Sequence, residues 1–381
     1  MQDVYLDNAA TTYPKPEQVY EAMDRWHRDI GGNPGRSGHH RAVESGRTIL
    51  RARTAVANLL GAGDSSRVVF TKNATEALNL GIKGVLKTGD HALTSCMEHN
   101  SVWRPLEALR AHGVDYSRVD CNPDGSIDID RVAEAIRPNT RLLCFMHASN
   151  VTGGLFPLDN LAALARERGI PLLVDAAQTA GCYPIDVEAS GIDMLAFTGH
   201  KELFGPQGTG GLYVREGVTL EPLLEGGTGS NSRQPVQPDF LPDRFESGTP
   251  NGVGLAGLAA GVGFLLEETI AKVREHAREL TMRLLEGLRA LPGVELYGPD
   301  NWEDRVGIVS FNIEGFDSAE AASLLDERYG ICARSGLHCS PLAHQTIGTL
   351  ERGTVRAGTS YLTPAQDVDY LIDCVRAITS R

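Results

Sequence analysis

The chain has 381 residues, of which 41% are apolar and 22% are charged, a composition that excludes a disordered or fibrous protein. The length exceeds that of a usual single domain, so we expect a large domain and a smaller one. The formal net charge of −13 argues against nucleic acid as a partner, because nucleic-acid-binding proteins concentrate Lys and Arg on one face.

The amino-terminal residues 1–8 contain neither the basic nor the apolar segment of a secretory signal, and no apolar run reaches the length of a membrane span. The seven cysteines are scattered, odd in number and never spaced as Cys-x-x-Cys, which disfavours a disulfide framework or a zinc site. We therefore expect a cytoplasmic protein with no metal ion and no membrane partner.

Short apolar runs alternate with amphipathic helical patterns in the first half of the chain. The predicted strands are 68–70, 92–94, 142–146, 172–174, 194–197 and 211–214. The predicted helices between them are 76–85, 102–111 and 158–168. The runs are continuous rather than alternating, as in strands that are buried on both faces. This pattern predicts a mostly parallel sheet covered by helices.

A segment rich in Gly, Pro, Asn and Ser, 226–251, is too long for a simple connector and indicates a functional loop or a domain boundary. The elements predicted after it are helices 270–291, 319–328 and 365–378 and strands 294–297 and 306–311. We therefore predict a large α/β domain over 15–250 and a small α+β domain made of 1–14 and 251–381.

Chemistry is expected where polar residues follow predicted strands, because ligands of open α/β sheets bind at the carboxyl ends of the strands. Lys201 follows strand 194–197 in a glycine-rich segment, and Asp175 follows strand 172–174. A lone lysine there is usually a surface residue, and a lone aspartate is often a helix cap. Together they fit pyridoxal phosphate (PLP), whose pyridine nitrogen needs a carboxylate partner.

Other predicted strand ends carry residues that suit the same cofactor. The turn at 71–75 opens a helix whose free backbone N–H groups suit a phosphate. His99 and Asn150 follow two further strands. A lone histidine is more often structural than catalytic, but several strand ends that each present such residues favour a PLP site.

The sequence resembles the class V aminotransferase group of fold-type I PLP enzymes, and within it the cysteine desulfurase/selenocysteine lyase family. The matching segments are Tyr5-Leu-Asp-Asn-Ala-Ala-Thr-Thr, Asn73-Ala-Thr-Glu-Ala-Leu-Asn, Met97-Glu-His-Asn, Val174-Asp-Ala-Ala-Gln, Gly199-His-Lys-Glu-Leu-Phe-Gly-Pro, Arg244-Phe-Glu-Ser-Gly-Thr-Pro-Asn and Arg334-Ser-Gly-Leu-His-Cys. The resemblance implies a fold-type I PLP-dependent transferase, with a mostly parallel seven-stranded sheet in a large domain and a small α+β domain.

The resemblance also implies how PLP is held. Lys201 carries it as a Schiff base, while Asp175 holds the pyridine nitrogen, Gln178 the phenolic oxygen, and His99 stacks on the ring. The phosphate is bound by the residues Ala74, Thr75, Thr198 and His200. Thr249 matches a residue that completes the phosphate site of the partner subunit, so a homodimer is expected.

Arg356 matches the arginine that pairs with the substrate α-carboxylate, assisted by Asn150, and Arg334 is a further substrate-binding candidate. Cys339 matches the nucleophilic cysteine. It lies in a polar, glycine-containing loop, where the neighbouring Arg334 and His338 would lower a thiol pKa. By contrast, we expect five other cysteines to be small buried hydrophobic residues, namely Cys96, Cys121, Cys144, Cys182 and Cys374.

The reaction implied by the resemblance converts L-cysteine to L-alanine. Lys201 removes the substrate Cα proton, Cys339 attacks the substrate sulfur and becomes a persulfide, and the sulfur then passes to an acceptor protein or thiol. His99 is the candidate acid or base for the substrate thiol.

Some positions depart from the SufS-like branch of the family. Leu337 stands where a histidine is usual, Tyr361-Leu-Thr stands where Tyr-Asn-Thr is usual, and 33–39 differs from the familiar pattern. L-selenocysteine as substrate, a selenocysteine lyase, another C–S lyase and an aminotransferase therefore stay open as alternatives. A non-enzymatic sulfur carrier or scaffold is the alternative from a different class.

Overall fold

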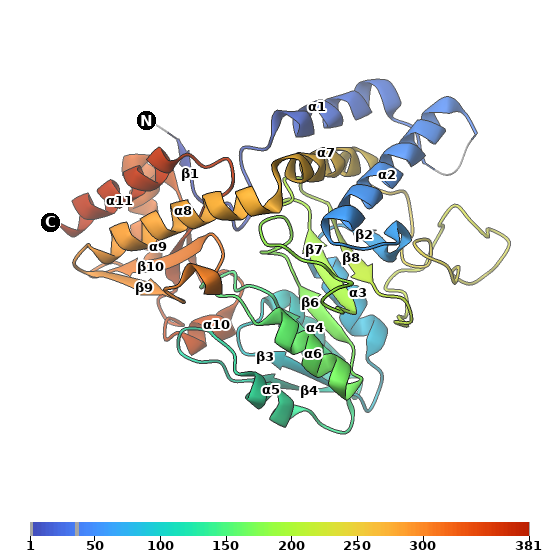
Figure 1. Cartoon of the computed structure of the whole chain (residues 1–381), viewed down its shortest axis with the longest axis horizontal. Helices are drawn as coiled ribbons and strands as arrows, with labels where there is room; N and C mark the ends of the chain where they lie inside the picture. The colour runs from blue at the N-terminus through green and yellow to red at the C-terminus, as the bar shows by residue number, and fades with distance from the viewer. Residues whose placement is uncertain (1–2, 35–37, 381) are drawn as a thin grey trace.

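A seven-stranded sheet forms the centre of the larger part of the molecule in the computed structural model (Figure 1). Its strands lie in the order β2 (Val68–Thr71), β8 (Gly210–Val214), β7 (Met194–Thr198), β6 (Leu172–Asp175), β5 (Thr140–Met146), β3 (His91–Ser95) and β4 (Asp115–Val119). Neighbouring strands are parallel except at β8, which is antiparallel to both β2 and β7. The predicted mostly parallel seven-stranded sheet is confirmed.

The structure describes residues 3–34 and 38–380, so part of the segment 33–39 lies outside the described residues. The helices around the large sheet are α1 (Glu17–Arg25), α2 (His40–Leu59), α3 (Ala74–Val85), α4 (Asn100–Arg110), α5 (Ile129–Ala135), α6 (Leu158–Arg168) and α7 (Gly252–Glu268). Leu173 packs in one core with α3 and α4, whereas Val174 packs in another with α2, α6 and α7. Both faces of the strands are thus buried, which explains their continuous apolar sequences.

Helix α7 is missing from the predicted elements because glycines at 252, 254, 257, 261 and 263 count against a helix. The helix is stabilised by packing, because its glycines let neighbouring elements approach it closely. A Cβ on Gly257 would lie 2.9 Å from Cγ of Met23, and one on Gly261 would lie 2.5 Å from the carbonyl oxygen of Leu203. Although the predicted boundary assigns α7 to the small domain, it packs on α1 and α2. The two-domain division itself stays a prediction.

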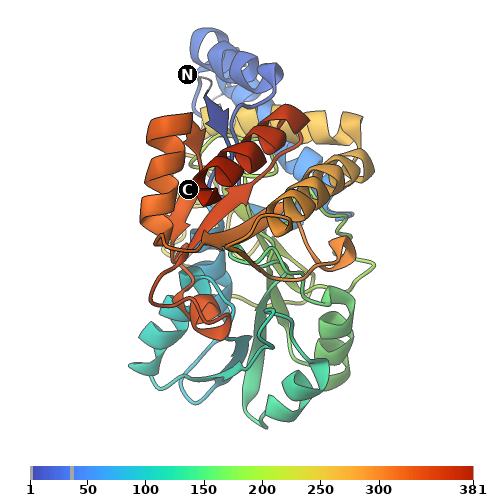
Figure 2. The same cartoon turned by 90° about the vertical axis from the view of Figure 1, so that its left-hand side faces the viewer.

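The carboxyl-terminal part contains a second, antiparallel sheet with the order β12 (Arg334–Gly336), β13 (Thr354–Gly358), β10 (Ile308–Ile313) and β9 (Val294–Tyr297). Its helices are α8 (Ile270–Arg289), α9 (Ser318–Tyr329), α10 (Pro341–Thr346) and α11 (Ala365–Thr379). The amino-terminal strand β1 (Val4–Tyr5) pairs in parallel with β11 (Ile331–Cys332), beside these elements (Figure 2). The two ends of the sequence therefore share one core.

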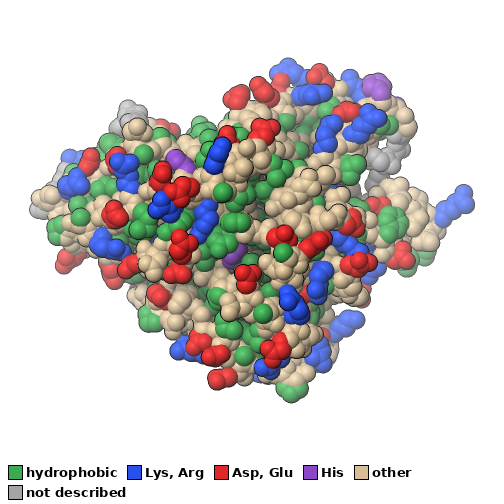
Figure 3. Space-filling view, in the orientation of Figure 1, with side chains coloured by type: hydrophobic (Ala, Val, Ile, Leu, Met, Phe, Trp, Pro, Cys, Tyr) green, Lys and Arg blue, Asp and Glu red, His purple; other side chains and the backbone are tan. Residues whose placement is uncertain are grey.

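Acidic and basic side chains are interspersed over the face of the molecule shown in Figure 3. Among the described helices, none is by itself long and apolar enough to cross a membrane. Helices α7 and α8 meet those criteria only as a pair that is bent by 83°.

Candidate active site

A cavity of about 250 Å³ lies at the carboxyl ends of β5, β6 and β7. Most of the predicted site residues line it, namely Ala74, Thr75, His99, Asn150, Asp175, Gln178, Thr198, His200, Lys201, Arg334 and Arg356. Cys339 and Thr249 do not. The parallel sheet brings these distant segments together because its strands all end at the same edge.

Lys201 and Asp175 both line this cavity, and the charge of each acts on the other. Asp175 ends β6 and is buried, and its Oδ1 accepts a hydrogen bond of 2.9 Å from the backbone N–H of Ala177. Burial raises the pKa of Asp175, whereas the charge of Lys201 opposes that shift. Burial also lowers the pKa of Lys201 to about 8, against the attraction of Asp175. A lysine with so low a pKa is readily available as a neutral amine, the form that reacts with carbonyl groups.

His99 is the N-cap of α4, and its imidazole is held by the first turn of that helix. Nδ1 accepts a hydrogen bond of 3.0 Å from the backbone N–H of Ser101, so the neutral ring carries its proton on Nε2. Burial lowers the pKa of His99 to about 4, helped by the charges of Lys201 and Arg334. The ring is therefore neutral at pH 7.

Ser101 is a site residue that the sequence reasoning missed. Its hydroxyl lies 2.9 Å from Nδ1 of His99 and 2.8 Å from Oγ1 of Thr75, so it joins the two predicted site residues. The signal in the sequence is its position two residues after His99 and immediately before the predicted helix 102–111.

One end of the cavity has polar groups without partners. Helix α3 begins at Ala74, with Asn73 as its N-cap, so the free N–H groups of its first turn lie at the cavity. Oγ1 of Thr198 and Nδ1 of His200 are buried and have no hydrogen-bond partner among the described residues. Buried polar groups are rarely left unsatisfied, so this end suits an anionic ligand that accepts hydrogen bonds.

Gln178 is buried at the cavity wall and donates a hydrogen bond of 3.2 Å from Nε2 to the carbonyl oxygen of Ala9. This contact holds the side-chain amide in the cavity wall, where it can contact a bound ligand.

Arg356, on β13, is 1% exposed and reaches the cavity from the small sheet. Nη1 donates to the carbonyl oxygen of Asn150 at 3.0 Å, and Nη2 donates to Oδ1 of Asp7 at 2.9 Å. Nε has no partner among the described residues. Asp7 was missed by the sequence reasoning, because no local signal links the amino terminus to residue 356.

The side chain of Asn150 holds the cysteine loop rather than pointing only to the cavity. Its Nδ2 donates to the carbonyl oxygen of His338 at 2.7 Å, and its Oδ1 accepts from the hydroxyl of Ser340 at 2.8 Å. The backbone N–H of Asn100 also donates to the carbonyl oxygen of Cys339 at 2.9 Å. The loop is therefore fixed to the large sheet from both sides of Cys339.

Cys339 is exposed, and Nη2 of Arg334 lies 3.7 Å from its sulfur. The expectation that His338 contributes positive charge beside the thiol is wrong. The His338 ring is buried, its Nε2 lies 3.1 Å from the carbonyl oxygen of Thr354, and burial lowers its pKa to about 2. Arg334 is thus the positive group that adjoins the thiol.

Thr249 lies in the long loop and lines a different cavity of about 410 Å³, together with Arg53, Phe70 and Glu246. Arg53 and Glu246 are joined by an ion pair of 2.6 Å. The predicted contribution of Thr249 to a partner subunit stays a prediction.

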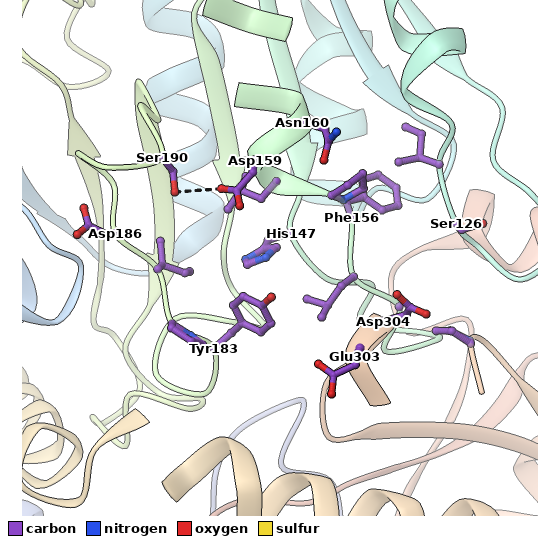
Figure 4. Close-up of a pocket in the computed structure, with 18 of the residues that line it drawn as sticks. Ser126, His147, Phe156, Asp159, Asn160, Tyr183, Asp186, Ser190, Glu303 and Asp304 are labelled. Carbon is purple, nitrogen blue, oxygen red and sulfur yellow. Dashed lines mark hydrogen bonds between the residues drawn. The ribbon is translucent and has the colours of Figure 1, made fainter. Parts of the chain in front are cut away.

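A larger cavity, of about 900 Å³, lies beside α6 and the start of α8 (Figure 4). His147 and Tyr183 meet there edge to face, with ring centroids 4.9 Å apart, and Asp159 accepts a hydrogen bond from Ser190. None of the described residues that line it is a lysine. It therefore has no amine that could bind a carbonyl cofactor.

The sheet and the cavity together define an α/β protein whose strand carboxyl ends form a cavity lined by a lysine and a buried aspartate. The family model for aminotransferase class V matches residues 4–371, and the chain belongs to that family.

Relatives of this chain are named as cysteine desulfurases. A probable cysteine desulfurase of Methanothermobacter thermautotrophicus is 36% identical, over 98% of this chain and 94% of the relative. A cysteine desulfurase of Haloferax volcanii is 34% identical, over 98% of this chain and 89% of the relative. The solved apo structure of cysteine desulfurase from Thermococcus onnurineus has a TM-score of 0.92 and 32% identity, covering 99% of this chain and 95% of that one. The predicted family and fold are confirmed.

Proposed function

We propose that this protein is a PLP-dependent cysteine desulfurase, which converts L-cysteine to L-alanine and transfers the sulfur to Cys339 as a persulfide. The observation that carries the proposal is the presence of Lys201 and Asp175 in one cavity, next to a fixed loop that presents Cys339. The relatives named as cysteine desulfurases support it.

The residues of the cavity fit PLP. Lys201 would bind it covalently through its amine, Asp175 would hold the pyridine nitrogen, and Gln178 and His99 would contact the ring. The phosphate would take the unpartnered Thr198 Oγ1 and His200 Nδ1, with the first turn of α3 at Ala74 and Thr75. When bound, PLP withdraws electrons from the substrate, which labilises the Cα proton and the C–S bond.

Lys201 is the proton carrier at the substrate Cα. Burial lowers the pKa of this amine to about 8, so it can accept a proton and later return it at neutral pH. Arg356 is the anchor for the substrate carboxylate, with its free Nε as a first donor.

Cys339 is the sulfur acceptor. Its sulfur attacks the sulfur of the bound substrate, so that an S–S bond forms and the substrate C–S bond breaks, with the electron pair left on carbon. Protonation of that carbon gives alanine. His99, whose Nε2 carries a proton, is the group that donates a hydrogen bond to the substrate thiol.

We further propose a homodimer in which Thr249 completes the phosphate site of the partner subunit, and an acceptor thiol that takes the sulfur from Cys339. The exposure of Cys339 supports the second point, because an acceptor can reach its sulfur from solvent.

The test is to incubate the PLP-loaded protein separately with L-cysteine and L-selenocysteine, to measure alanine, and to look for a persulfide on Cys339 by mass spectrometry. We expect alanine from L-cysteine and a persulfide on Cys339. Alanine from selenocysteine alone would assign a selenocysteine lyase instead. Sulfide release by Cys339→Ala as fast as by the parent would overturn the persulfide mechanism.

A further inference from the structure

Two further cysteines, Cys96 and Cys121, lie outside the cavity described above. Cys96 directly follows β3, and Cys121 follows β4 after a single residue, and these two strands are parallel neighbours in the sheet. The backbone N–H of Cys121 donates to the sulfur of Cys96 at 3.2 Å. The sheet register therefore brings two cysteines 25 residues apart into direct contact.

Both cysteines are partly exposed residues at the surface of the molecule. Each is partly buried, and both line a surface cavity of about 630 Å³ whose wall also contains Arg110 and Arg118. By contrast, Cys144 lies in the apolar core between the sheet and its helices. The expectation that Cys96 and Cys121 are ordinary buried hydrophobes therefore overlooks their access to solvent.

The surroundings of the two thiols make them chemically unequal. The Cys121 thiol, and to a smaller extent the Thr346 hydroxyl at 3.1 Å, lower the pKa of Cys96 to about 6, against burial and the charge of Asp120. The same contact with Cys96 strongly raises the pKa of Cys121. The Cys96 sulfur accepts the backbone N–H of Cys121 and lies beside the Thr346 hydroxyl, so these contacts favour the thiolate form at Cys96 rather than at Cys121.

We propose that Cys96 and Cys121 form a redox-active dithiol, in which a peroxide oxidises Cys96 and Cys121 then closes a disulfide. A nucleophilic cysteine that is accessible and adjoins a second cysteine is the arrangement of thiols that sense oxidants. The inference is independent of the proposed desulfurase activity, because neither residue lines the PLP cavity.

The oxidation takes place in two steps. The Cys96 thiolate attacks one oxygen of the peroxide, so that the O–O bond breaks, the sulfur is oxidised to a sulfenic acid, and hydroxide leaves. The Cys121 sulfur then attacks the Cys96 sulfur, the S–O bond breaks, and water leaves as the S–S bond forms. Two thiols have been oxidised, and one peroxide has been reduced to water.

The test treats the reduced full-length protein with hydrogen peroxide and maps disulfides by mass spectrometry of unreduced peptides. We expect a Cys96–Cys121 disulfide in the parent. In Cys121→Ser we expect a sulfenic acid on Cys96 that dimedone traps, and in Cys96→Ser we expect no disulfide. The matched control Cys332→Ser removes another partly buried thiol and should leave the disulfide unchanged.

A second measurement needs no variant. Alkylation of the parent by iodoacetamide at pH 7 should modify Cys96 on the order of tenfold faster than Cys332, whose pKa is raised to about 11 by burial and Asp3. Equal rates at the two cysteines would overturn the proposal. So would a peroxide-treated parent in which Cys96 is oxidised but never joined to Cys121.

Discussion

Arg356 and Asp7 form an ion pair, with 2.9 Å between Nη2 and Oδ1, in which the guanidinium is buried and the carboxylate comes from the amino-terminal segment. This pair joins the first residues of the chain to the last strand of the small sheet. The ion pair also occupies Nη2 of the guanidinium that we assign to binding the substrate carboxylate.

We expect Asp7→Asn to lower the free energy of unfolding by about 1–3 kcal/mol, because a buried charge loses its ionic partner. Thermal unfolding of the protein without substrate measures this. Asp3→Asn is the matched control, since Asp3 is exposed in the same segment and should have little effect. Equal losses in the two variants would contradict the prediction.

Lys201→Ala should abolish both the visible absorbance of covalently bound PLP and the formation of alanine from L-cysteine. The reason is that the variant lacks the amine that we assign to cofactor attachment and to proton transfer. Absorbance spectra and an alanine assay check this, with Lys83→Ala, an exposed lysine on α3, as the control. A parent protein that stays colourless after reconstitution with PLP would instead support a non-enzymatic carrier.

Glu98 should make stability depend on pH. It is buried, and burial raises its pKa to about 8, above the ordinary value of 4.5 that it has in the unfolded chain. Between these values the folded state binds the extra proton, so the carboxyl favours folding at low pH and this contribution is lost as the pH rises toward 8.

We therefore expect Glu98→Gln, which stays neutral, to weaken the fall in unfolding temperature between pH 5 and pH 8 that the parent shows. Thermal unfolding of both proteins at the two pH values measures the difference. An identical fall in parent and variant would show that Glu98 is not the group responsible.

Two glycines of α7 should respond oppositely to the same change. A Cβ at Gly261 would lie 2.5 Å from the carbonyl oxygen of Leu203, a backbone atom that cannot rotate away, so Gly261→Ala should destabilise by about 1–3 kcal/mol. At Gly263 no atom lies within 4 Å of the added Cβ. Gly263→Ala should therefore stabilise the helix by about 0.5–1 kcal/mol. Chemical denaturation of the two variants checks the signs, and two changes of the same sign would refute the packing argument.

The large sheet could be predicted from the sequence because its central strands are continuous apolar runs followed by polar residues. Asp175 comes directly after one such run and Lys201 follows another within a few residues, so strand ends alone place them in one site. Strand β4 was missed, because it lies at the sheet edge and has a mostly polar, partly exposed sequence.

Contacts between distant segments could not be predicted. Nothing local pairs Asp7 with Arg356, and nothing in the residues around His338 reveals that its ring turns inward to Thr354. The contact between Cys96 and Cys121 depends on which strands are neighbours. Such contacts depend on the strand order and register, which cannot be predicted from short segments of the sequence.

The anchoring of the cysteine loop limits how far sulfur can be carried. Only residues 337–340 separate β12 from α10, and Asn150 and Asn100 hold that short span to the large sheet. A tether of this length cannot swing its thiol across the surface of the molecule. Under the proposed function, delivery must therefore take place at the rim of the cavity, and the recipient must extend its own thiol to that fixed point.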